Sequence, residues 1–184
     1  MKIIKKTKEL QNILEIINRP TTSIGLVLTM GNIHSGHLSL IKEAKNNNEY
    51  VITSIFVNPT QFNNDDDYSS YPKTLDEDIE KLKSSSCDML YLPSVEEMYP
   101  KGLVTEKSIL KYRHILCDVS RPGHFDGVTT VVNTFFNMIN PTNSYFGEKD
   151  YQQIKLIDEM VKIKKLNINI VACSSIRDKN GMSL

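Results

Sequence analysis

Two hydrophobic patterns alternate along the chain. Short runs of apolar and β-branched residues, typical of strands buried on both faces, predict strands at 24–28, 50–57, 88–92, 143–146 and 168–173. Helical spacing of apolar residues and helix-start signals predict helices at 7–18, 38–45, 74–84, 128–139 and 149–166. Because strands that alternate with helices favour a parallel sheet with right-handed crossovers, we expect an α/β fold.

One long polar segment interrupts this alternation. Residues 58–73 read as a polar loop that contains the acidic run 65–67. Loops of this length inside a compact domain are usually functional or mobile. For the acidic run itself, a solvated loop is favoured over a magnesium site.

Two further segments carry helix signals of different strength. The sequences TLDE at 74–77 and SVEE at 94–97 fit the capping box, which predicts a helix start at each. Residues 100–120 have the weakest pattern of the chain, and a short strand followed by a helix over 109–117 fits them best.

Composition narrows the class of protein. The chain has 184 residues, enough for one compact domain, and 22 Lys and Arg balance 22 Asp and Glu. Balanced charge provides no global field for nucleic acid or anionic membranes, so we expect neither partner. No apolar run approaches the roughly 20 residues of a membrane helix, and no signal peptide is recognised, which favours a soluble cytoplasmic protein. The cysteines, Cys87, Cys117 and Cys173, form no C-x-x-C pair and are expected to be reduced, buried thiols.

Four polar clusters follow predicted strands, at 29–37, 58–61, 147–150 and 177–180. The carboxyl ends of parallel strands meet at one edge of a sheet, and ligands of α/β proteins bind there. We therefore expect the four clusters to surround one cleft.

The most informative cluster is the stretch TMGNIHSGHL at 29–38, called the histidine turn below. The free N–H groups at the start of the following helix favour a phosphate or carboxylate, and Gly31 and Gly36 allow a ligand to approach the backbone. The spacing of these glycines matches the P-loop, but the Lys and the Ser or Thr that must follow the second glycine are missing. The dinucleotide fingerprint GxGxxG is absent as well.

His34 and His37 allow two chemistries. A histidine pair on one side of a turn can chelate zinc, but no cysteine or third histidine lies near them in the sequence. Two imidazoles beside a helix start are better suited to donate hydrogen bonds to phosphate oxygens as charge develops in a transition state. Loop histidines without a function would be the better interpretation of an isolated pair. The glycines and the neighbouring clusters favour phosphate binding.

The other clusters offer side chains for a polar substrate. Lys149 can neutralise a phosphate, and Gln153, one helical turn later, can orient a hydroxyl or a carboxylate; a plain charged helix start is the alternative. Asn58 and Gln61 offer uncharged donors and acceptors, with ordinary turn chemistry as the alternative.

Three residues of the segment 114–124 complete the candidates. Arg121 and His124 either reach the cleft or fix the turn in which they lie, and the sequence favours neither. His114 lies in the least legible segment and is given no role.

Together these residues resemble a known family, pantothenate synthetase, also called pantoate beta-alanine ligase. The motifs that carry the resemblance are TMGNIHSGHL at 29–38, SIFVNPTQF at 54–62, YP at 71–72, RPGHFDGV at 121–128 and FGEKDYQQ at 146–153. They cover nearly the whole chain in the order and spacing of the family, which makes the resemblance specific.

The resemblance implies a Rossmann-like parallel sheet with helices on both faces, of the HIGH-type nucleotidylyl transferase superfamily, in a homodimer. It also implies ATP-dependent ligation in two steps with ATP and Mg²⁺. Pantoate attacks the α-phosphate of ATP to give pantoyl adenylate and pyrophosphate, and beta-alanine then attacks the adenylate to give pantothenate and AMP.

The resemblance also implies roles for individual residues. ATP would contact Met30, Gly31, Asn32, Ile33, His34, Ser35, Gly36, His37, Gly147, Glu148, Lys149, Asp150, Ile176 and Leu184. Among these, His37 would be the proton donor, with His34 and Lys149 beside it on the phosphates and Asp150 on the metal. Gln61 would bind pantoate and beta-alanine, Gln153 would bind pantoate, and Asn58 would join this substrate site.

Two departures from the family qualify these expectations. Leu28 stands where the family usually has proline, which should loosen the turn without removing a ligand. Family members continue beyond the position of Leu184 into a smaller domain that closes over the site, so we expect residues 1–184 to be the ATP- and pantoate-binding domain. A ligase with little turnover, a non-catalytic ATP-binding fragment and a related nucleotidylyl transferase stay open as alternatives.

Overall fold

A sheet of six parallel strands organises the part of the chain that the structure describes. The computed structural model describes residues 1–17, 21–62, 64–105, 111 and 115–184. The strands are β1 (Lys2–Ile4), β2 (Ile24–Thr29), β3 (Tyr50–Ile55), β4 (Met89–Tyr91), β5 (Asn143–Gly147) and β6 (Asn169–Cys173). Their order in the sheet is β1-β4-β3-β2-β5-β6, and every neighbouring pair is parallel. This confirms the expected α/β class.

The helices alternate with the strands. They are α1 (Thr7–Ile17), α2 (Ser35–Asn47), α3 (Asp65–Ser69), α4 (Leu75–Lys83), α5 (Val95–Met98), α6 (Cys117–Ser120), α7 (His124–Ile139) and α8 (Tyr151–Ile163), with 3-10 turns η1 (Pro59–Gln61) and η2 (Glu148–Asp150).

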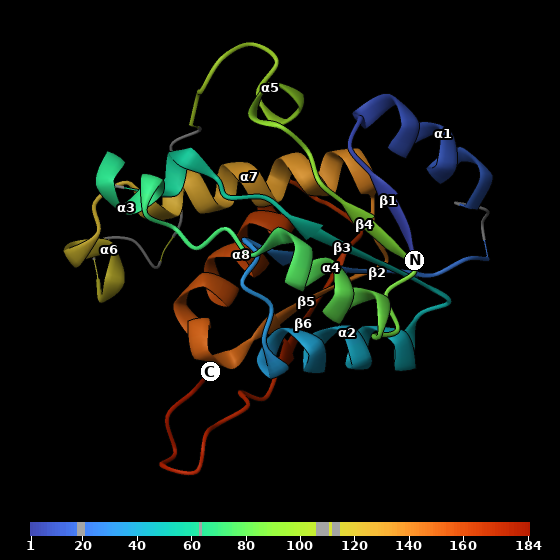
Figure 1. Cartoon of the computed structure of the whole chain (residues 1–184). Coiled ribbons are helices and arrows are strands. Elements are labelled where there is room, and N and C mark those ends of the chain that lie inside the picture. Colours follow the sequence, from blue (N-terminus) through green and yellow to red (C-terminus); the bar gives the residue numbers. More distant parts are fainter. Residues whose placement is uncertain (18–20, 63, 106–110, 112–114) are drawn as a thin grey trace.

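Helices cover both faces of the sheet, as expected. Leu10 and Leu14 of α1 belong to one core with the apolar residues of α7 and α8. Ile41 of α2 and Leu82 of α4 belong to the second core, on the opposite face. Figure 1 shows α7 above the sheet and α2 below it. The histidine turn therefore reaches the carboxyl edge of the sheet between two packed layers.

Several local expectations need correction. The loop at 58–73 contains η1 and α3, and the acidic run 65–67 opens α3 instead of lying in an unstructured loop. The capping box at 74–77 is not formed, because the Thr74 hydroxyl donates to the Asp78 carboxylate, 3.0 Å away, and caps no backbone group. At 94–97 the expected cap is present, since the Ser94 side chain accepts from the backbone N–H of Glu97.

The terminal strand and the segment 100–120 differ from expectation in other ways. β1 was not expected from the lysine-rich start, because three residues with one buried side chain carry little periodicity. Most of the helix expected at 109–117 lies outside the described residues, as does His114; α6 begins at Cys117. Cys117 is exposed and Cys173 partly buried, so only Cys87 fulfils the expectation of a buried thiol.

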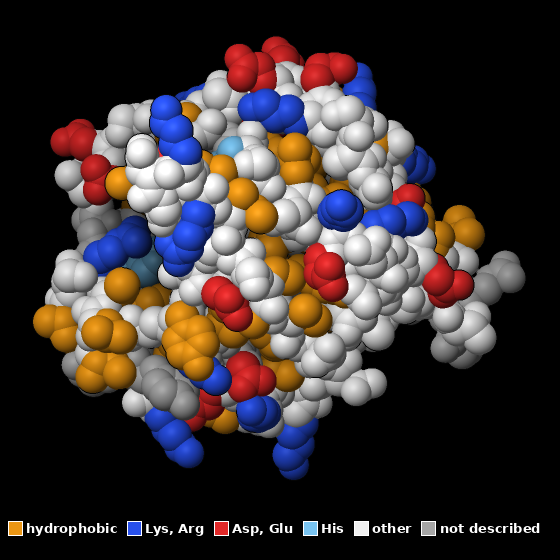
Figure 2. All heavy atoms as spheres, turned by 90° about the horizontal axis from the view of Figure 1, so that it is seen from below, with side chains coloured by type: hydrophobic (Ala, Val, Ile, Leu, Met, Phe, Trp, Pro, Cys, Tyr) orange, Lys and Arg blue, Asp and Glu red, His pale blue; other side chains and the backbone are white. Residues whose placement is uncertain are grey.

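The surface carries mixed charge. On the face seen from below in Figure 2, Lys and Arg side chains are interspersed with Asp and Glu. Among the described residues, no helix combines the length and the hydropathy that crossing a membrane requires.

Candidate phosphate and substrate site

The histidine turn begins where β2 ends. The Thr29 hydroxyl donates to the carbonyl oxygen of Ser54 at 2.8 Å and accepts from the Gly31 N–H at 3.2 Å. The chain then passes through two left-handed residues, Gly31 with φ +88° and Asn32 with φ +51°. Glycine suits the first position because a Cβ there would lie 3.1 Å from an Asp78 carboxylate oxygen and because φ is positive. This reversal directs the following residues toward the edge of the sheet.

Both histidines cap the helix that follows. His34 is the N-cap of α2, and its Nδ1 accepts from the Gly36 N–H at 3.1 Å. The His37 Nδ1 accepts from the His34 N–H at 3.4 Å, which completes a capping box built from two imidazoles. Because of these caps, helix α2 begins at Ser35, three residues before the predicted start. The prediction was late because histidine is an uncommon N-cap residue.

These caps assign the tautomer of both rings. A ring nitrogen that accepts a hydrogen bond carries no proton, so each neutral imidazole carries its proton on Nε2. The ring centroids of His34 and His37 lie 4.1 Å apart. Burial, then the nearby His34 and Lys149, lower the pKa of His37 to about 4, against an opposing effect of Asp78. The pair therefore offers two uncharged Nε2–H donors at neutral pH.

The pKa of His34 is lowered as well. Burial, then the charges of Lys149 and Lys81, lower the pKa of His34 below its usual value. Both histidines are therefore uncharged at neutral pH, and the positive charges that act on His34 are those of Lys149 and Lys81.

A cavity of about 290 Å³ lies beside the turn. Its lining includes the predicted residues Met30, Gly31, Asn32, His34, His37, Asn58, Gln61, Lys149, Asp150 and Gln153. Its apolar lining comes mainly from α7 and from the ends of the central strands, namely Leu28, Phe56, Val128, Val131, Val132, Phe135 and Phe146. The structure thus joins three of the four predicted clusters at one place.

A second cavity of about 80 Å³ shares a wall with the first. His34, His37, Lys149 and Asp150 line both cavities. The predicted residues Gly36, Gly147, Ile176 and Leu184 line only the second. The four shared residues therefore stand between the smaller cavity and the larger, partly apolar one.

Three predicted nucleotide contacts lie outside both cavities. The Ile33 side chain is 1% exposed and belongs to the second core, whereas Ser35 and Glu148 are exposed. The Ile33 side chain has a packing role in this arrangement.

Lys149 is the cation of the shared wall. Its side chain is exposed, and its Nζ donates to the backbone carbonyl of Leu184 at 3.0 Å. Asp150 is the N-cap residue of α8, but its side chain makes no capping hydrogen bond there. Its exposed carboxylate lines the two cavities. Both groups are accessible to a ligand in the cleft.

Asn58 is committed to the protein interior. It is 1% exposed, and its Oδ1 accepts from the Tyr99 hydroxyl at 2.7 Å. Its Nδ2 lies 3.2 Å from Gln61 Oε1 and 3.2 Å from the Gly127 carbonyl oxygen. Asn58 therefore orients Gln61, whose Nε2 lies 2.9 Å from the Met30 sulfur and which lines the cavity.

His124 of α7 fixes the turn at 58–61 as well. Its Nδ1 lies 2.8 Å from the Gln61 carbonyl oxygen, its side chain is buried, and it does not line the two cavities above. Arg121 is exposed. Neither residue reaches the two cavities: His124 fixes the turn at 58–61 instead of its own turn, and Arg121 lines neither cavity.

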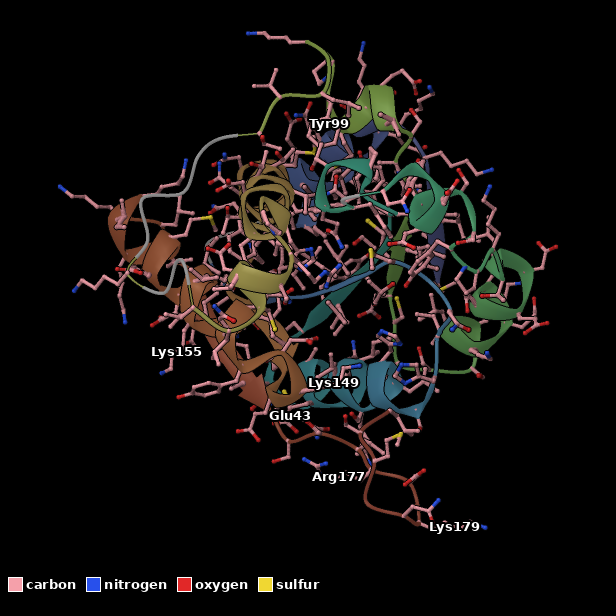
Figure 3. The ribbon with its side chains drawn as sticks, turned by 90° about the vertical axis from the view of Figure 1, so that its left-hand side faces the viewer. Glu43, Tyr99, Lys149, Lys155, Arg177 and Lys179 are labelled. Carbon is pink, nitrogen blue, oxygen red and sulfur yellow. The ribbon has the colours of Figure 1, made fainter. Side chains whose placement is uncertain are left out.

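The fourth cluster is not part of the cleft. Residues 177–180 are exposed and line neither cavity, and the Arg177 guanidinium donates to the Gly181 carbonyl oxygen at 2.9 Å. Figure 3 shows Arg177 and Lys179 on a loop below the body of the protein, away from Lys149. The expectation of four converging clusters was wrong here because this segment leaves the sheet after β6 as an exposed loop.

Asp78 supports the histidine turn but was not among the residues predicted from the sequence. It lies on α4, 1% exposed, and accepts hydrogen bonds from the backbone of the histidine turn. The available signal was its position: Leu75, Asp78, Ile79 and Leu82 form an i, i+3, i+4, i+7 set, so a carboxylate occupies the apolar face of the helix. A buried carboxylate needs hydrogen-bond donors, which the turn provides.

Among the described residues, the histidine pair has no third side chain that could complete a zinc site. Within residues 1–17, 21–62, 64–105, 111 and 115–184, no group of three or more His, Cys, Asp and Glu side chains could hold a metal ion. Both Nδ1 atoms are in addition occupied as hydrogen-bond acceptors.

Comparisons with known proteins identify the family of the chain. A sequence model described as pantoate-beta-alanine ligase matches residues 2–184. The chain is 44% identical over 184 residues to the pantothenate synthetases of Thermosipho africanus and Caldicellulosiruptor bescii. These alignments cover 100% of this chain but 66% and 65% of the relatives, so the chain spans slightly less than two thirds of their length.

Solved structures show the same fold. The pantoate-beta-alanine ligase of Francisella tularensis, complexed with beta-gamma ATP and beta-alanine, matches with a TM-score of 0.96 and 45% identity, over 100% of this chain and 70% of that one. The pantothenate synthetase of Thermus thermophilus matches with a TM-score of 0.93 and 38% identity, over 100% of this chain and 65% of that one. The sheet and its helices form a Rossmann-like domain of the nucleotidylyl transferase type.

Proposed function

Because the chain belongs to the pantoate-beta-alanine ligase family, we propose that it binds ATP and pantoate for the ATP-dependent condensation of pantoate with beta-alanine. The observation that carries the proposal is the wall of His34, His37, Lys149 and Asp150 between two cavities. A reaction between a nucleotide phosphate and a second small molecule needs such a boundary, since the reacting atoms must meet there.

The lining of each cavity supports an assignment. We assign the nucleoside of ATP to the smaller cavity, beside Gly147, Ile176 and Leu184. Pantoate, which has a branched apolar centre and polar ends, suits the larger cavity, where valines of α7 share the lining with Gln61 and Gln153. The α-phosphate would then lie against the shared wall.

The chemistry follows from this placement. A carboxylate oxygen of pantoate attacks the α-phosphorus, the bond from that phosphorus to the bridging oxygen of pyrophosphate breaks, and pantoyl adenylate forms. The Nε2–H groups of His34 and His37 and the Lys149 ammonium stabilise the charge that develops on the phosphate oxygens. With a pKa of about 4 in the free protein, His37 acts at neutral pH as a hydrogen-bond donor. The amine of beta-alanine then attacks the acyl carbon and displaces AMP, losing a proton.

Mg²⁺ fits this site as a companion of ATP. The ion commonly uses one or two carboxylates together with substrate phosphates, and Asp150 is an exposed carboxylate that lines both cavities. Mg²⁺ would neutralise phosphate charge, and Asp150 would hold it.

The remaining expectations concern the environment of the protein. We propose a homodimer in the cytoplasm with no nucleic-acid or membrane partner. The dimer is an expectation from the family resemblance alone, and the equal numbers of basic and acidic residues support the absence of polyanionic partners. Sedimentation at several protein concentrations tests the dimer, and a single monomeric species would contradict it.

Pantoate-dependent release of pyrophosphate tests the reaction. We expect calorimetric binding of ATP by the chain, and pyrophosphate release that requires pantoate. His37→Ala should lower release about 100-fold or more, because it removes a donor to the transition state. Arg177→Ala, outside both cavities, is the control and should match the unmodified chain.

Other outcomes would identify the alternatives. ATP binding without pantoate-dependent release would support a binding module that requires the remainder of the relatives' length. A stable dinucleotide or nucleoside diphosphate product would support a nucleotidylyl transferase and exclude ligation.

A further inference from the structure

The back of the histidine turn lies against helix α4. Asp78 Oδ1 accepts from the Ile33 N–H at 2.7 Å, and Oδ2 accepts from the Asn32 N–H at 2.9 Å. The Thr74 hydroxyl donates to the same Oδ2 at 3.0 Å. Each carboxylate oxygen is therefore satisfied, and charge-assisted hydrogen bonds of this kind are stronger than neutral ones.

Lys81, one helical turn after Asp78, holds the next polar group of the turn. Its Nζ donates to the Ile33 carbonyl oxygen at 2.8 Å. Asp78 and Lys81 together bind three backbone groups, the N–H of Asn32 and both polar groups of Ile33. The Ile33 side chain is also buried in the second core, so this peptide segment is fixed on every side.

The segment needs such support because its backbone is strained. Asn32 has φ +51°, a left-handed conformation that an L-residue adopts at a cost of roughly 1 kcal/mol. The residue after Ile33 is His34, the N-cap of α2. A shift of the peptide at 32–33 would move the His34 ring and break its bond to Gly36, and with it the cap that orients His37.

The same contacts restrict where a phosphate can bind. Two successive N–H groups beside a left-handed glycine form a concave site that suits an anion. Here Asp78 already occupies it, so the N–H groups of Asn32 and Ile33 are not free to bind ATP. The imidazole Nε2–H groups remain as the donors of the turn.

We propose that Asp78 and Lys81 are positioning residues, which set the orientation of His34 and His37 by holding the backbone of Asn32 and Ile33. The inference rests on the proposed function, in which these histidines bind the phosphates of ATP. Neither α4 residue touches the nucleotide in this arrangement; both act through the turn.

The test compares Asp78→Asn and Lys81→Met with a matched control, Asp76→Asn. Asp76 is exposed on the same helix, so the control removes an equal charge without a contact to the turn. Three measurements are made on each protein: the thermal unfolding midpoint, the ¹⁵N shifts of the imidazoles, which report the tautomer, and the dissociation constant of ATP. Amide hydrogen exchange at Asn32 and Ile33 is recorded alongside.

In folded Asp78→Asn we expect the amides of Asn32 and Ile33 to exchange about 10-fold faster or more, and ATP to bind about 10-fold more weakly. The histidine shifts should move away from a pure Nε2–H tautomer. Lys81→Met should show the same changes at smaller amplitude, and Asp76→Asn should match the unmodified chain. A purely structural role would lower the unfolding midpoint and leave the tautomers of the folded molecules unchanged.

The inference is wrong if both variants fold and keep the tautomers and the exchange rates of the unmodified chain. Should Asp78→Asn fail to fold, Lys81→Met alone decides by the same measurements. If the unmodified chain does not bind ATP, the proposed function fails, whereas exchange and tautomer still test the positioning role.

Discussion

On one side of the cleft, the histidine turn and the turn at 58–61 are held by buried side chains, Asp78 and Asn58, each 1% exposed. On the other side, Lys149 and Asp150 are exposed, and the Lys149 ammonium contacts the carbonyl of Leu184 in an equally exposed segment. The first side is anchored in the protein interior through these two side chains; the second lies on the surface of the same domain.

This difference separates two tasks. Donors that are fixed before the ligand arrives need no reorganisation during the reaction, which favours transition-state stabilisation. An exposed lysine on a flexible stem can follow phosphate oxygens as they move. Substitutions on the fixed side should therefore affect folding, whereas substitutions on the exposed side should affect binding alone.

The largest effect is expected at Gly127, where α7 touches the turn at 58–61. A Cβ at this position would overlap the Thr60 carbonyl and lie 2.8 Å from the Gln61 Cα. Gly127→Ala should lower the free energy of unfolding by about 3 kcal/mol, because the clash is with backbone. Urea denaturation measures the loss. Gly147→Ala, with no atom within 4 Å of its Cβ, is the control on the exposed side. Equal stability of the two variants would contradict the distinction between the sides.

A smaller effect, on binding only, is expected at Lys149. Lys149→Met should weaken ATP binding about 10- to 100-fold, since a hydrogen bond to a charged group contributes about 1.5–3 kcal/mol. Its unfolding midpoint should stay within about 2 °C of the unmodified chain, because the side chain is exposed. Calorimetry and thermal scans give both values. A large fall in the midpoint would place Lys149 on the fixed side.

The next effect is a pH dependence of stability on the fixed side. The pKa of His37 is lowered from 6.5 to about 4, mainly by burial, so the unfolded chain takes up a proton first as pH falls. The contribution of neutral His37 to stability is complete above pH 6.5 and declines toward pH 4, by at most about 1.4 kcal/mol per pH unit. Denaturation of the unmodified chain and His37→Asn between about pH 7.5 and pH 4.5 measures it. Parallel profiles of the two proteins would show that His37 does not titrate in this way.

The smallest effect is expected in the exposed loop after β6. Arg177→Ala and Lys179→Ala should change the free energy of unfolding by less than about 0.5 kcal/mol and leave ATP binding unchanged. Both side chains are exposed and outside the two cavities. Weaker ATP binding by either variant would show that the fourth cluster, 177–180, contributes to the cleft after all.

Much of the fold could be predicted from local patterns. The apolar runs of β2 and β3 and the apolar stripe of α7 have strong periodicity, and each was found where it was expected. The three clusters that line the larger cavity follow β2, β3 and β5, so the topology of a parallel sheet was enough to bring them together.

The parts that were not predicted depend on contacts distant in the sequence. Asp78 meets the histidine turn across 45 residues of sequence, and its own helix gives no indication of that partner. The role of Asn58 likewise depends on Tyr99, 41 residues later. The early start of α2 depends on an imidazole acting as a cap, which helix propensities do not anticipate.

The order of the strands has a consequence for the order of assembly. β2 and β3 are joined by one helix, but β2 reaches its other neighbour through contacts such as that between Ile24 and Thr142, 118 residues apart. In synthesis from the N-terminus, the histidine turn therefore leaves the ribosome long before the opposite wall exists. Pairing between distant parallel strands is slow, because chain entropy is lost before contacts are gained. The cleft is completed late, and a nascent chain that has not reached β5 presents its two histidines without a pocket.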